Sequence, residues 1–173
     1  MMTRHVFLIG MPGCGKSSLG RRVANNLRLP YVDMDQRIAQ GACCGSVAEL
    51  FERYGEAAFR NAETNMLIQL TREEPSIVST GGGTVLREVN RAIMRNHGLI
   101  LLIDRPLEQI MSDIKLDRRP LLAQKGLGEV ERLYNERIDI YRSVADLVLD
   151  NSRGYQAGML GMERILRNTF AGI

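Results

Sequence analysis

The chain has 173 residues, of which 45% are hydrophobic and 25% are charged, and its formal net charge is +3. These are ordinary globular values, so they exclude a disordered or low-complexity chain, and the length suits one domain with a full hydrophobic core. The weak positive charge includes no run of basic residues, so we expect no nucleic-acid partner. The sequence contains neither an apolar run of about 18 residues nor a basic-then-apolar leader, which predicts a cytoplasmic protein without a membrane partner.

The first predicted element is a short β-strand over residues 5–10, HVFLIG, which continues into the stretch GMPGCGKSS. That stretch fits G-x-x-x-x-G-K-[ST], and a helix is predicted over residues 16–27 because Leu19, Val23 and Leu27 lie four residues apart. A strand before the motif and a helix after it favour a phosphate-binding loop over a simple glycine-rich turn. The predicted nucleotide-binding residues here are Gly13, Cys14, Gly15, Lys16, Ser17 and Ser18. Lys16 can reach the outer phosphates, and the Ser17 hydroxyl can bind Mg²⁺.

Strand and helix patterns alternate along the rest of the chain. Further strands are predicted over residues 31–35, 76–83, 98–104 and 145–150. Helices are predicted over residues 45–55, 55–70, 106–115 and 129–144 and at the C-terminus, and Ser46 and Glu49 have the spacing of a capping box. This alternation predicts an α/β fold, a five-stranded parallel sheet flanked by helices in one domain over residues 1–173.

Chemically useful residues follow the first three predicted strands. The phosphate loop follows the first, Asp33 and Asp35 end the second, and the Gly81–Gly83 triplet ends the third. Ligands of open α/β sheets bind outside the carboxyl ends of the strands, so we expect these residues to meet. The adjacent pair Cys43–Cys44 lacks the spacing of zinc ligands, and we expect structural packing for the cysteines.

Six stretches occur together in the chain: GMPGCGKSS, DMD, GEAAFRNAE, TGGG, RRPLL and the arginine and tyrosine of ERIDIYR. In order and approximate spacing they resemble the shikimate kinase family over nearly the whole length. The resemblance implies a single-domain P-loop kinase fold with a substrate-binding helical region at about residues 33–62 and a mobile lid at about residues 112–127. It also implies transfer of the γ-phosphoryl group of ATP to the 3-hydroxyl of shikimate, a step of aromatic amino-acid biosynthesis, by an Mg²⁺-dependent monomer.

The resemblance also implies roles for individual acidic and basic residues. Lys16, Asp35 and Arg119 would be catalytic, with Asp35 contacting the attacking hydroxyl and Arg119 reaching the phosphates from the lid. Asp33 would hold Mg²⁺ beside Ser17, most readily through water. Arg60 and Arg137 would bind the carboxylate of shikimate, because a planar guanidinium matches carboxylate geometry. Glu63, three residues after Arg60, would orient it.

Three further assignments concern glycines, the nucleotide base and departures from the family pattern. Gly81, Gly82 and Gly83 would let substrate approach the backbone, with the Gly82 N–H donating to it. Arg153 would contact adenine, whereas Ser112 stands where many relatives carry an adenine-side arginine. Asp139 stands where the family commonly has proline, close to Arg137.

Several alternatives remain open at the level of sequence. Asp104 ends an apolar run, as a Walker B aspartate that binds Mg²⁺ does, although the resemblance favours Asp33 for the metal. Another P-loop kinase, such as a gluconate kinase or a nucleoside monophosphate kinase, would share the loop and the element order. A nucleotide-binding switch protein is disfavoured because the chain has no N-K-x-D segment for reading guanine.

Overall fold

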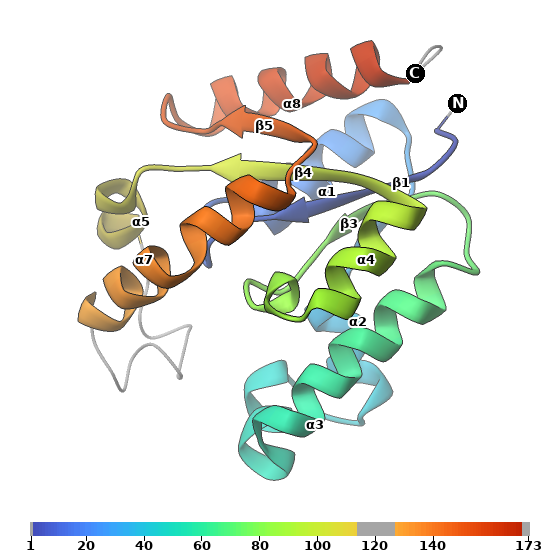
Figure 1. Ribbon diagram of the computed structural model, residues 1–173. Helices are drawn as coiled ribbons and strands as arrows, with labels where there is room; N and C mark the ends of the chain where they lie inside the picture. The colour runs from blue at the N-terminus through green and yellow to red at the C-terminus, as the bar shows by residue number, and fades with distance from the viewer. Residues whose placement is uncertain (1, 114–126, 171–173) are drawn as a thin grey trace.

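The computed structural model describes residues 2–113 and 127–170 of the chain, and the fold is built around one β-sheet (Figure 1). Its strands lie in the order β2-β3-β1-β4-β5, and every neighbouring pair is parallel. The strands are β1 His5–Ile9, β2 Tyr31–Asp33, β3 Ile77–Ser79, β4 Gly98–Asp104 and β5 Leu147–Asp150. The helices are α1 Lys16–Leu27, α2 Met34–Gly41, α3 Val47–Leu70, the short 3₁₀ helix η1 Thr84–Leu86, α4 Glu88–His97, α5 Leu107–Asp113, α7 Leu127–Val144 and α8 Tyr155–Thr169. The predicted five-stranded parallel α/β fold is therefore confirmed.

Strand β1 lies at the centre of the sheet and pairs with β3 on one side and β4 on the other. After β1 the chain crosses to the edge strand β2, returns to β3 beside β1, and then continues on the other side of β1 with β4 and β5, so the strand order reverses there. A crevice at such a reversal, outside the carboxyl ends of the strands, is the usual ligand site of this architecture. The phosphate loop leaves the sheet at this point, between β1 and α1.

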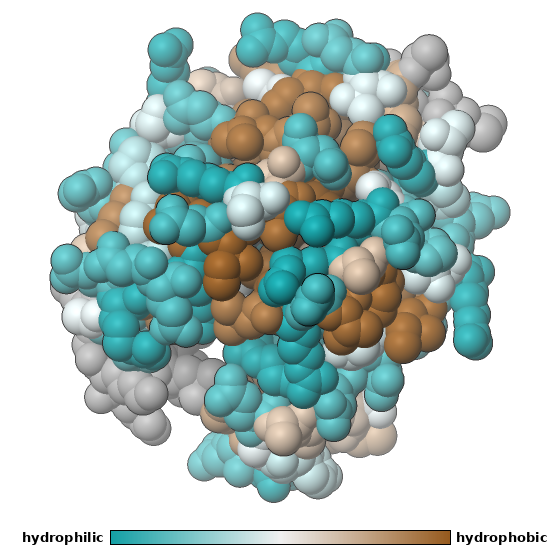
Figure 2. Space-filling model, in the orientation of Figure 1, coloured by the Kyte–Doolittle hydropathy of each residue, from teal (hydrophilic) through white to brown (hydrophobic). Residues whose placement is uncertain are grey.

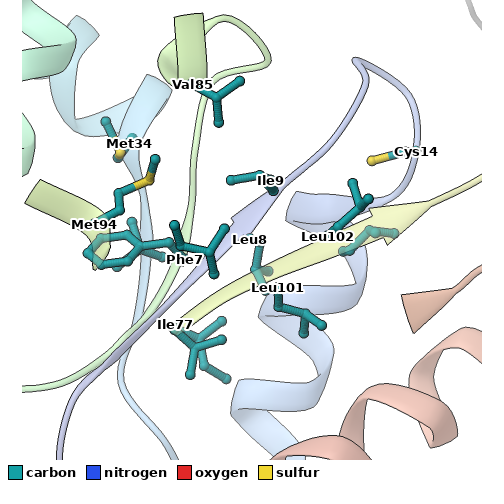
Figure 3. Close-up of a cluster of buried hydrophobic side chains, with 14 of the residues drawn as sticks. Phe7, Leu8, Ile9, Cys14, Met34, Ile77, Val85, Met94, Leu101 and Leu102 are labelled. Atoms are coloured by element: carbon teal, nitrogen blue, oxygen red, sulfur yellow. The ribbon is translucent and has the colours of Figure 1, made fainter. Parts of the chain in front are cut away.

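The helices cover the sheet in two layers, with α1 and α8 on one face and α4 and α7 on the other (Figure 1). Phe7 of β1 lies beside Met34 and Met94 on the α4 face (Figure 3). The next side chain along the strand, Leu8, packs toward α1, where a Cβ on Gly20 would lie 2.6 Å from it. This alternation, with both side chains fully buried, makes β1 a strand whose two faces both belong to the core.

The second predicted strand is shorter than expected, and this corrects the position of Asp35. Strand β2 ends at Asp33, whose carboxylate accepts a hydrogen bond from the Gln36 N–H at 3.2 Å and so caps helix α2. Asp35 therefore lies in the first turn of α2 rather than at the end of a strand. The third strand is also shorter than predicted, because it stops at Ser79 before the glycine triplet.

Helix α3 combines the two helices predicted on either side of Gly55. Gly55 has φ 79° and ψ 173°, which lies outside the helical region and breaks the helix direction. At the start of α3, the Ser46 hydroxyl accepts from the Glu49 N–H at 3.2 Å, as the predicted capping box requires. The Glu49 carboxylate accepts from the Gly45 N–H at 2.7 Å instead of the Ser46 N–H. The cap is thus present with one partner shifted by a residue.

Hydrophilic and hydrophobic side chains are interspersed over the face of the molecule seen in Figure 2. Within residues 2–113 and 127–170, no helix combines the length and the hydropathy that crossing a membrane would require.

Candidate functional site

A large cavity of about 1150 Å³ lies at the carboxyl edge of the sheet. Its wall combines the phosphate loop, the turn after β3 and residues of α2, α3 and α7, so segments distant in sequence meet in one hollow. Sequence-predicted residues that line it are Gly13, Gly15, Lys16, Ser17, Ser18, Asp35, Arg60, Gly81, Gly82, Gly83 and Arg137. The structure therefore brings together the residues predicted for nucleotide and for substrate.

The phosphate loop is closed by its own backbone and fixed from outside. Gly13 and Gly15 have φ values of 90° and 108°, a region that a side chain disfavours. The Cys14 N–H donates to the Met11 carbonyl at 3.1 Å, and the Cys14 carbonyl accepts from Asn151 Nδ2 at 2.8 Å. Cys14 itself is fully buried, so its side chain packs in the core while the loop backbone borders the cavity.

Lys16, the first residue of α1, places its charge inside the loop. Its ammonium donates to the Gly10 carbonyl at 2.8 Å and to the Met11 carbonyl at 3.0 Å. The side chain is buried, and carbonyl oxygens rather than a carboxylate satisfy it, so its positive charge is not neutralised by these contacts. A cation in that state is available to an anion that enters the loop.

Oxygen ligands gather where β2 and β3 end beside α1. Asp33 and Ser79 are register partners, and the Ser79 hydroxyl lies 3.0 Å from the Ser17 hydroxyl. The Tyr31 hydroxyl donates to Asp33 at 3.3 Å and approaches the Ser17 carbonyl at 3.4 Å. Burial raises the pKa of Tyr31, and the charge of Asp33 raises it further, so the phenol remains a donor. These hydroxyl and carboxylate groups are of the type that Mg²⁺ prefers.

Arg60 lies on α3 between two carboxylates. One terminal nitrogen is 2.7 Å from Glu63, while Nε and the other terminal nitrogen contact a single oxygen of Glu56 at 3.3 and 3.2 Å. The guanidinium also lies over the Phe59 ring, 5.3 Å from its centroid. Burial lowers the pKa of Arg60, but the two glutamates more than compensate, so its pKa lies above the ordinary value. Arg60 is therefore a fixed cation at the cavity wall.

Arg137 and Tyr141 approach the same region from α7. Arg137 is 9% exposed, and its Nε has no hydrogen-bond partner within the described part of the chain. The Tyr141 hydroxyl, one helical turn later, donates to the Gly82 carbonyl at 2.5 Å, and burial raises the pKa of Tyr141. This bond joins α7 to the glycine turn and holds Arg137 at the cavity. Asp139 lies between Arg137 and Tyr141, where the family commonly has proline, and α7 is continuous through this position.

The structure gives its own physical reason for the glycine triplet. A Cβ on Gly83 would overlap the Arg60 guanidinium, with Cζ only 2.7 Å away. A Cβ on Gly81 would lie 2.7 Å from a Glu63 oxygen and 3.0 Å from an Asp35 oxygen. At Gly81 and Gly83 the space that a side chain would take is therefore filled by neighbouring polar side chains of the protein.

The family model for shikimate kinase matches residues 12–166 of the chain. The chain belongs to the shikimate kinase family. A shikimate kinase of Clostridium beijerinckii is 41% identical to it over 152 residues, which cover 88% of each protein, and one of Paracidovorax citrulli is 37% identical over 172 residues, 97% of this chain and 93% of that protein. The structure of a shikimate kinase from Acinetobacter baumannii in complex with shikimate matches with a TM-score of 0.86 at 28% identity, covering 96% of this chain and 92% of that one.

Membership in the shikimate kinase family favours the predicted sites over their alternatives, but it leaves individual roles as predictions. Asp104 is paired with Arg142 at 3.3 Å and lines a separate, smaller hollow. Arg153 is exposed and is not among the cavity-lining residues, although its neighbours Gly154 and Tyr155 are. Arg119, the predicted lid arginine, lies outside the described residues, as does most of the predicted lid.

The next features are the cysteines and the candidate metal ligands within residues 2–113 and 127–170. There, no group of three or more His, Cys, Asp and Glu side chains is arranged to hold a metal. Cys43 is exposed and Cys44 is buried, and the Cys44 thiol donates to the Ala42 carbonyl at 3.5 Å. This local bond agrees with a packing role for Cys44.

Sequence reasoning missed Thr84, Asn90, Asn151 and Arg105. Thr84 donates to Glu63 at 2.5 Å, and Asn90 donates to the Thr84 carbonyl at 2.9 Å. Asn151 and Arg105 both bind the phosphate loop from the strands beside it, Arg105 through the Gly13 carbonyl at 3.3 Å. Only these last two carried a signal, because each directly follows a strand at the edge where ligands bind.

Proposed function

We propose that this chain transfers the γ-phosphoryl group of ATP to the 3-hydroxyl of shikimate, the step of aromatic amino-acid biosynthesis performed by its family. One observation carries the proposal: a single cavity is lined both by the phosphate loop and by two arginines, Arg60 and Arg137. Family membership over residues 12–166 supports the same reaction. We further propose that the protein acts as a cytoplasmic monomer, as its sequence predicts.

Recognition of an acid follows from the hydrogen bonds of Arg60. Its contacts with Glu63 and Glu56 use one N–H of each terminal nitrogen and the Nε–H. One N–H on each terminal nitrogen is left over and can donate to an incoming carboxylate. Arg137, with its buried Nε, supplies a second cation from α7. A neutral acceptor would leave these remaining N–H groups without an anionic partner, which disfavours a substrate that has no acidic group.

Asp35 is the residue that we assign to the acceptor hydroxyl. It lines the cavity from the first turn of α2, and one of its oxygens lies near Gly81 of the substrate-side turn. In the reaction the 3-oxygen of shikimate forms a bond to the γ-phosphorus, and the bond between that phosphorus and the ADP oxygen breaks. The hydroxyl proton passes to the Asp35 carboxylate, so charge and atoms balance.

Lys16 and the backbone N–H groups of the loop are assigned to the phosphates of ATP. Lys16 would exchange its contacts with the Gly10 and Met11 carbonyls for phosphate oxygens. The oxygen atoms of Ser17 and Asp33 are of the type that fits Mg²⁺. The two residues lie close together, because the Tyr31 hydroxyl contacts both the Ser17 carbonyl and the Asp33 carboxylate. Ser17 would hold the metal directly and Asp33 through water, and the bound metal would offset charge on the phosphates. Arg119 on the lid and Arg153 near adenine remain sequence-based parts of this proposal.

A substrate panel tests the proposed function. ADP release is measured with ATP and Mg²⁺ alone and after separate addition of shikimate, gluconate and a nucleoside monophosphate. We expect turnover to rise strongly with shikimate only. Equal or greater stimulation by gluconate or by the monophosphate would contradict the substrate assignment, and ATP turnover indifferent to all three would contradict kinase function.

A further inference from the structure

Glu63 is a carboxylate with no exposed surface, and within the described part of the chain each of its two oxygens has one donor. Arg60 donates to one oxygen at 2.7 Å, and the Thr84 hydroxyl donates to the other at 2.5 Å. A buried carboxylate is tolerated only when its oxygens are hydrogen-bonded, so both donors matter. Arg60 faces the cavity, whereas Thr84 approaches Glu63 from the turn after β3.

Thr84 is held in place on each side of its hydroxyl. It is fully buried at the start of η1, directly after the glycine triplet. Its N–H donates to the Gly81 carbonyl at 3.2 Å, and its carbonyl accepts from Asn90 Nδ2 at 2.9 Å. Asn90 in turn accepts from the Thr64 hydroxyl at 2.8 Å, one turn from Arg60 on α3. The Thr84 hydroxyl is therefore a rigid donor that joins the glycine turn to α3.

The Thr84 hydroxyl determines how many N–H groups of Arg60 Glu63 must engage. While Thr84 occupies one Glu63 oxygen, Glu63 needs only a single N–H from Arg60. Without that hydroxyl, the bare oxygen would be satisfied most easily by turning the carboxylate to take a second N–H of Arg60, since bidentate pairing is the preferred geometry of these groups. That second N–H is one of those left over for the substrate.

We propose that Thr84 is a positioning residue, which keeps Glu63 on one nitrogen of Arg60 and so leaves the guanidinium available to the substrate carboxylate. This inference rests on the proposed function, because it assigns the carboxylate on Arg60 to shikimate. It adds that Arg60 on α3 and the Gly81–Gly83 turn are held in register by one buried hydrogen bond. Within the described residues the hydrogen bonds of Thr84 go to Glu63, Gly81 and Asn90 and none goes to the nucleotide loop, so we expect its effect to fall on one substrate.

The test compares Thr84→Val with Thr84→Ser in the full-length protein. Valine keeps the shape but removes the donor, whereas serine keeps the donor. We expect valine to raise the KM for shikimate about tenfold or more, the scale of one hydrogen bond to a charged group, with the KM for ATP changed less than about twofold. Serine should restore the shikimate KM to within about threefold of wild type.

A stability control separates positioning from simple packing. Ser76→Ala removes another buried hydroxyl at the opposite end of β3, where it contacts His5. It should lower the melting temperature without raising the KM for shikimate. If Thr84→Val does not fold, Thr84→Cys takes its place. The thiol is a weaker donor than a hydroxyl, so the shikimate KM of this variant should be higher than that of wild type and of Thr84→Ser. It should stay below the KM expected when the donor is lost completely.

The possible outcomes separate the role of Thr84 from the proposed shikimate kinase function on which it rests. A Thr84→Val protein with an unchanged shikimate KM, or with both KM values raised alike, would overturn the role of Thr84 while shikimate kinase activity stands. A serine variant as impaired as valine would overturn it too, as would a cysteine variant with the wild-type shikimate KM where the valine variant does not fold. Wild-type protein that fails to phosphorylate shikimate would instead overturn the proposed function, and this inference with it.

Discussion

Removing the charges of Arg60 and Glu63 together should sharply reduce discrimination for an acidic substrate. Arg60→Met alone would leave the Glu63 carboxylate buried without its cation, at a cost of ~3–5 kcal/mol, a large part of the ~5–15 kcal/mol that stabilises a typical domain. The pair Arg60→Met and Glu63→Gln removes both charges at once, and glutamine still offers an acceptor to Thr84. The perturbation is thus confined to the binding of the substrate carboxylate.

The expected magnitude follows from the two remaining N–H groups of Arg60. Its side chain is 15% exposed, so solvent weakens these charge-assisted bonds little, and together they contribute about 3 kcal/mol, which corresponds to about a hundredfold in kcat/KM. The assay measures kcat/KM for shikimate and for an analogue in which hydrogen replaces the carboxylate. Wild type should prefer shikimate by about a hundredfold or more, and the double variant by about tenfold or less, with Arg137 supplying the remainder. The same preference in both proteins would refute the role of Arg60.

Three more predictions concern the phosphate loop, the lid and the core. Lys16→Ala should reduce phosphoryl transfer to background without lowering the melting temperature much, because the partners of its ammonium, two carbonyls and the Cys14 sulfur, all belong to the loop itself; near-normal turnover would contradict the loop assignment. Arg119→Ala should lower kcat about a hundredfold and Arg118→Ala should cost little, because the sequence places Arg119 directly before a proline, a position that favours extended backbone; a larger loss for Arg118→Ala would reverse the assignment. His5 is buried against the Leu70 carbonyl and Ser76, and burial lowers its pKa, so the unfolded chain binds more protons below about pH 6.5. Melting temperature should therefore fall as pH drops below 6.5, and His5→Gln should weaken that dependence; an unchanged pH dependence would exclude His5 as its source.

Strand β4 and the first helix were predictable because their signals are local. Strand β4 has an uninterrupted apolar run, and both its ends agree with the prediction. Helix α1 begins at Lys16 as expected, because the phosphate loop fixes where a helix can start. The Arg60–Glu63 pair was also within reach, since residues three apart on a helix are neighbours.

Asp35 shows where a local signal misled. YVDMD alternates like a strand, but the Asp33 side chain caps a helix, and that cap ends the strand two residues early. A strand and a capped helix start share the same apolar and acidic residues, so the pattern alone did not separate them. The consequence is chemical, because Asp35 reaches the cavity from a helix.

The contacts of Thr84 and Tyr141 could not be predicted from sequence. Thr84 meets Glu63 across 21 positions and Tyr141 meets Gly82 across 59, and each bond exists only after the sheet has assembled. Gly83 illustrates the same point, because the residue that requires it to be small, Arg60, lies on another element. Sequence located side chains that line the cavity, whereas the groups that hold those side chains emerged from packing.

The most direct test of the account is the identity and position of the phosphorylated product. The protein is incubated with ATP, Mg²⁺ and shikimate, and the product is analysed by mass spectrometry and by phosphorus–proton correlation in NMR. The account predicts one phosphate on shikimate, attached at the 3-oxygen, formed in equal amount with ADP and missing with Lys16→Ala. Phosphate on another hydroxyl, or inorganic phosphate as the sole product beside ADP, would contradict it.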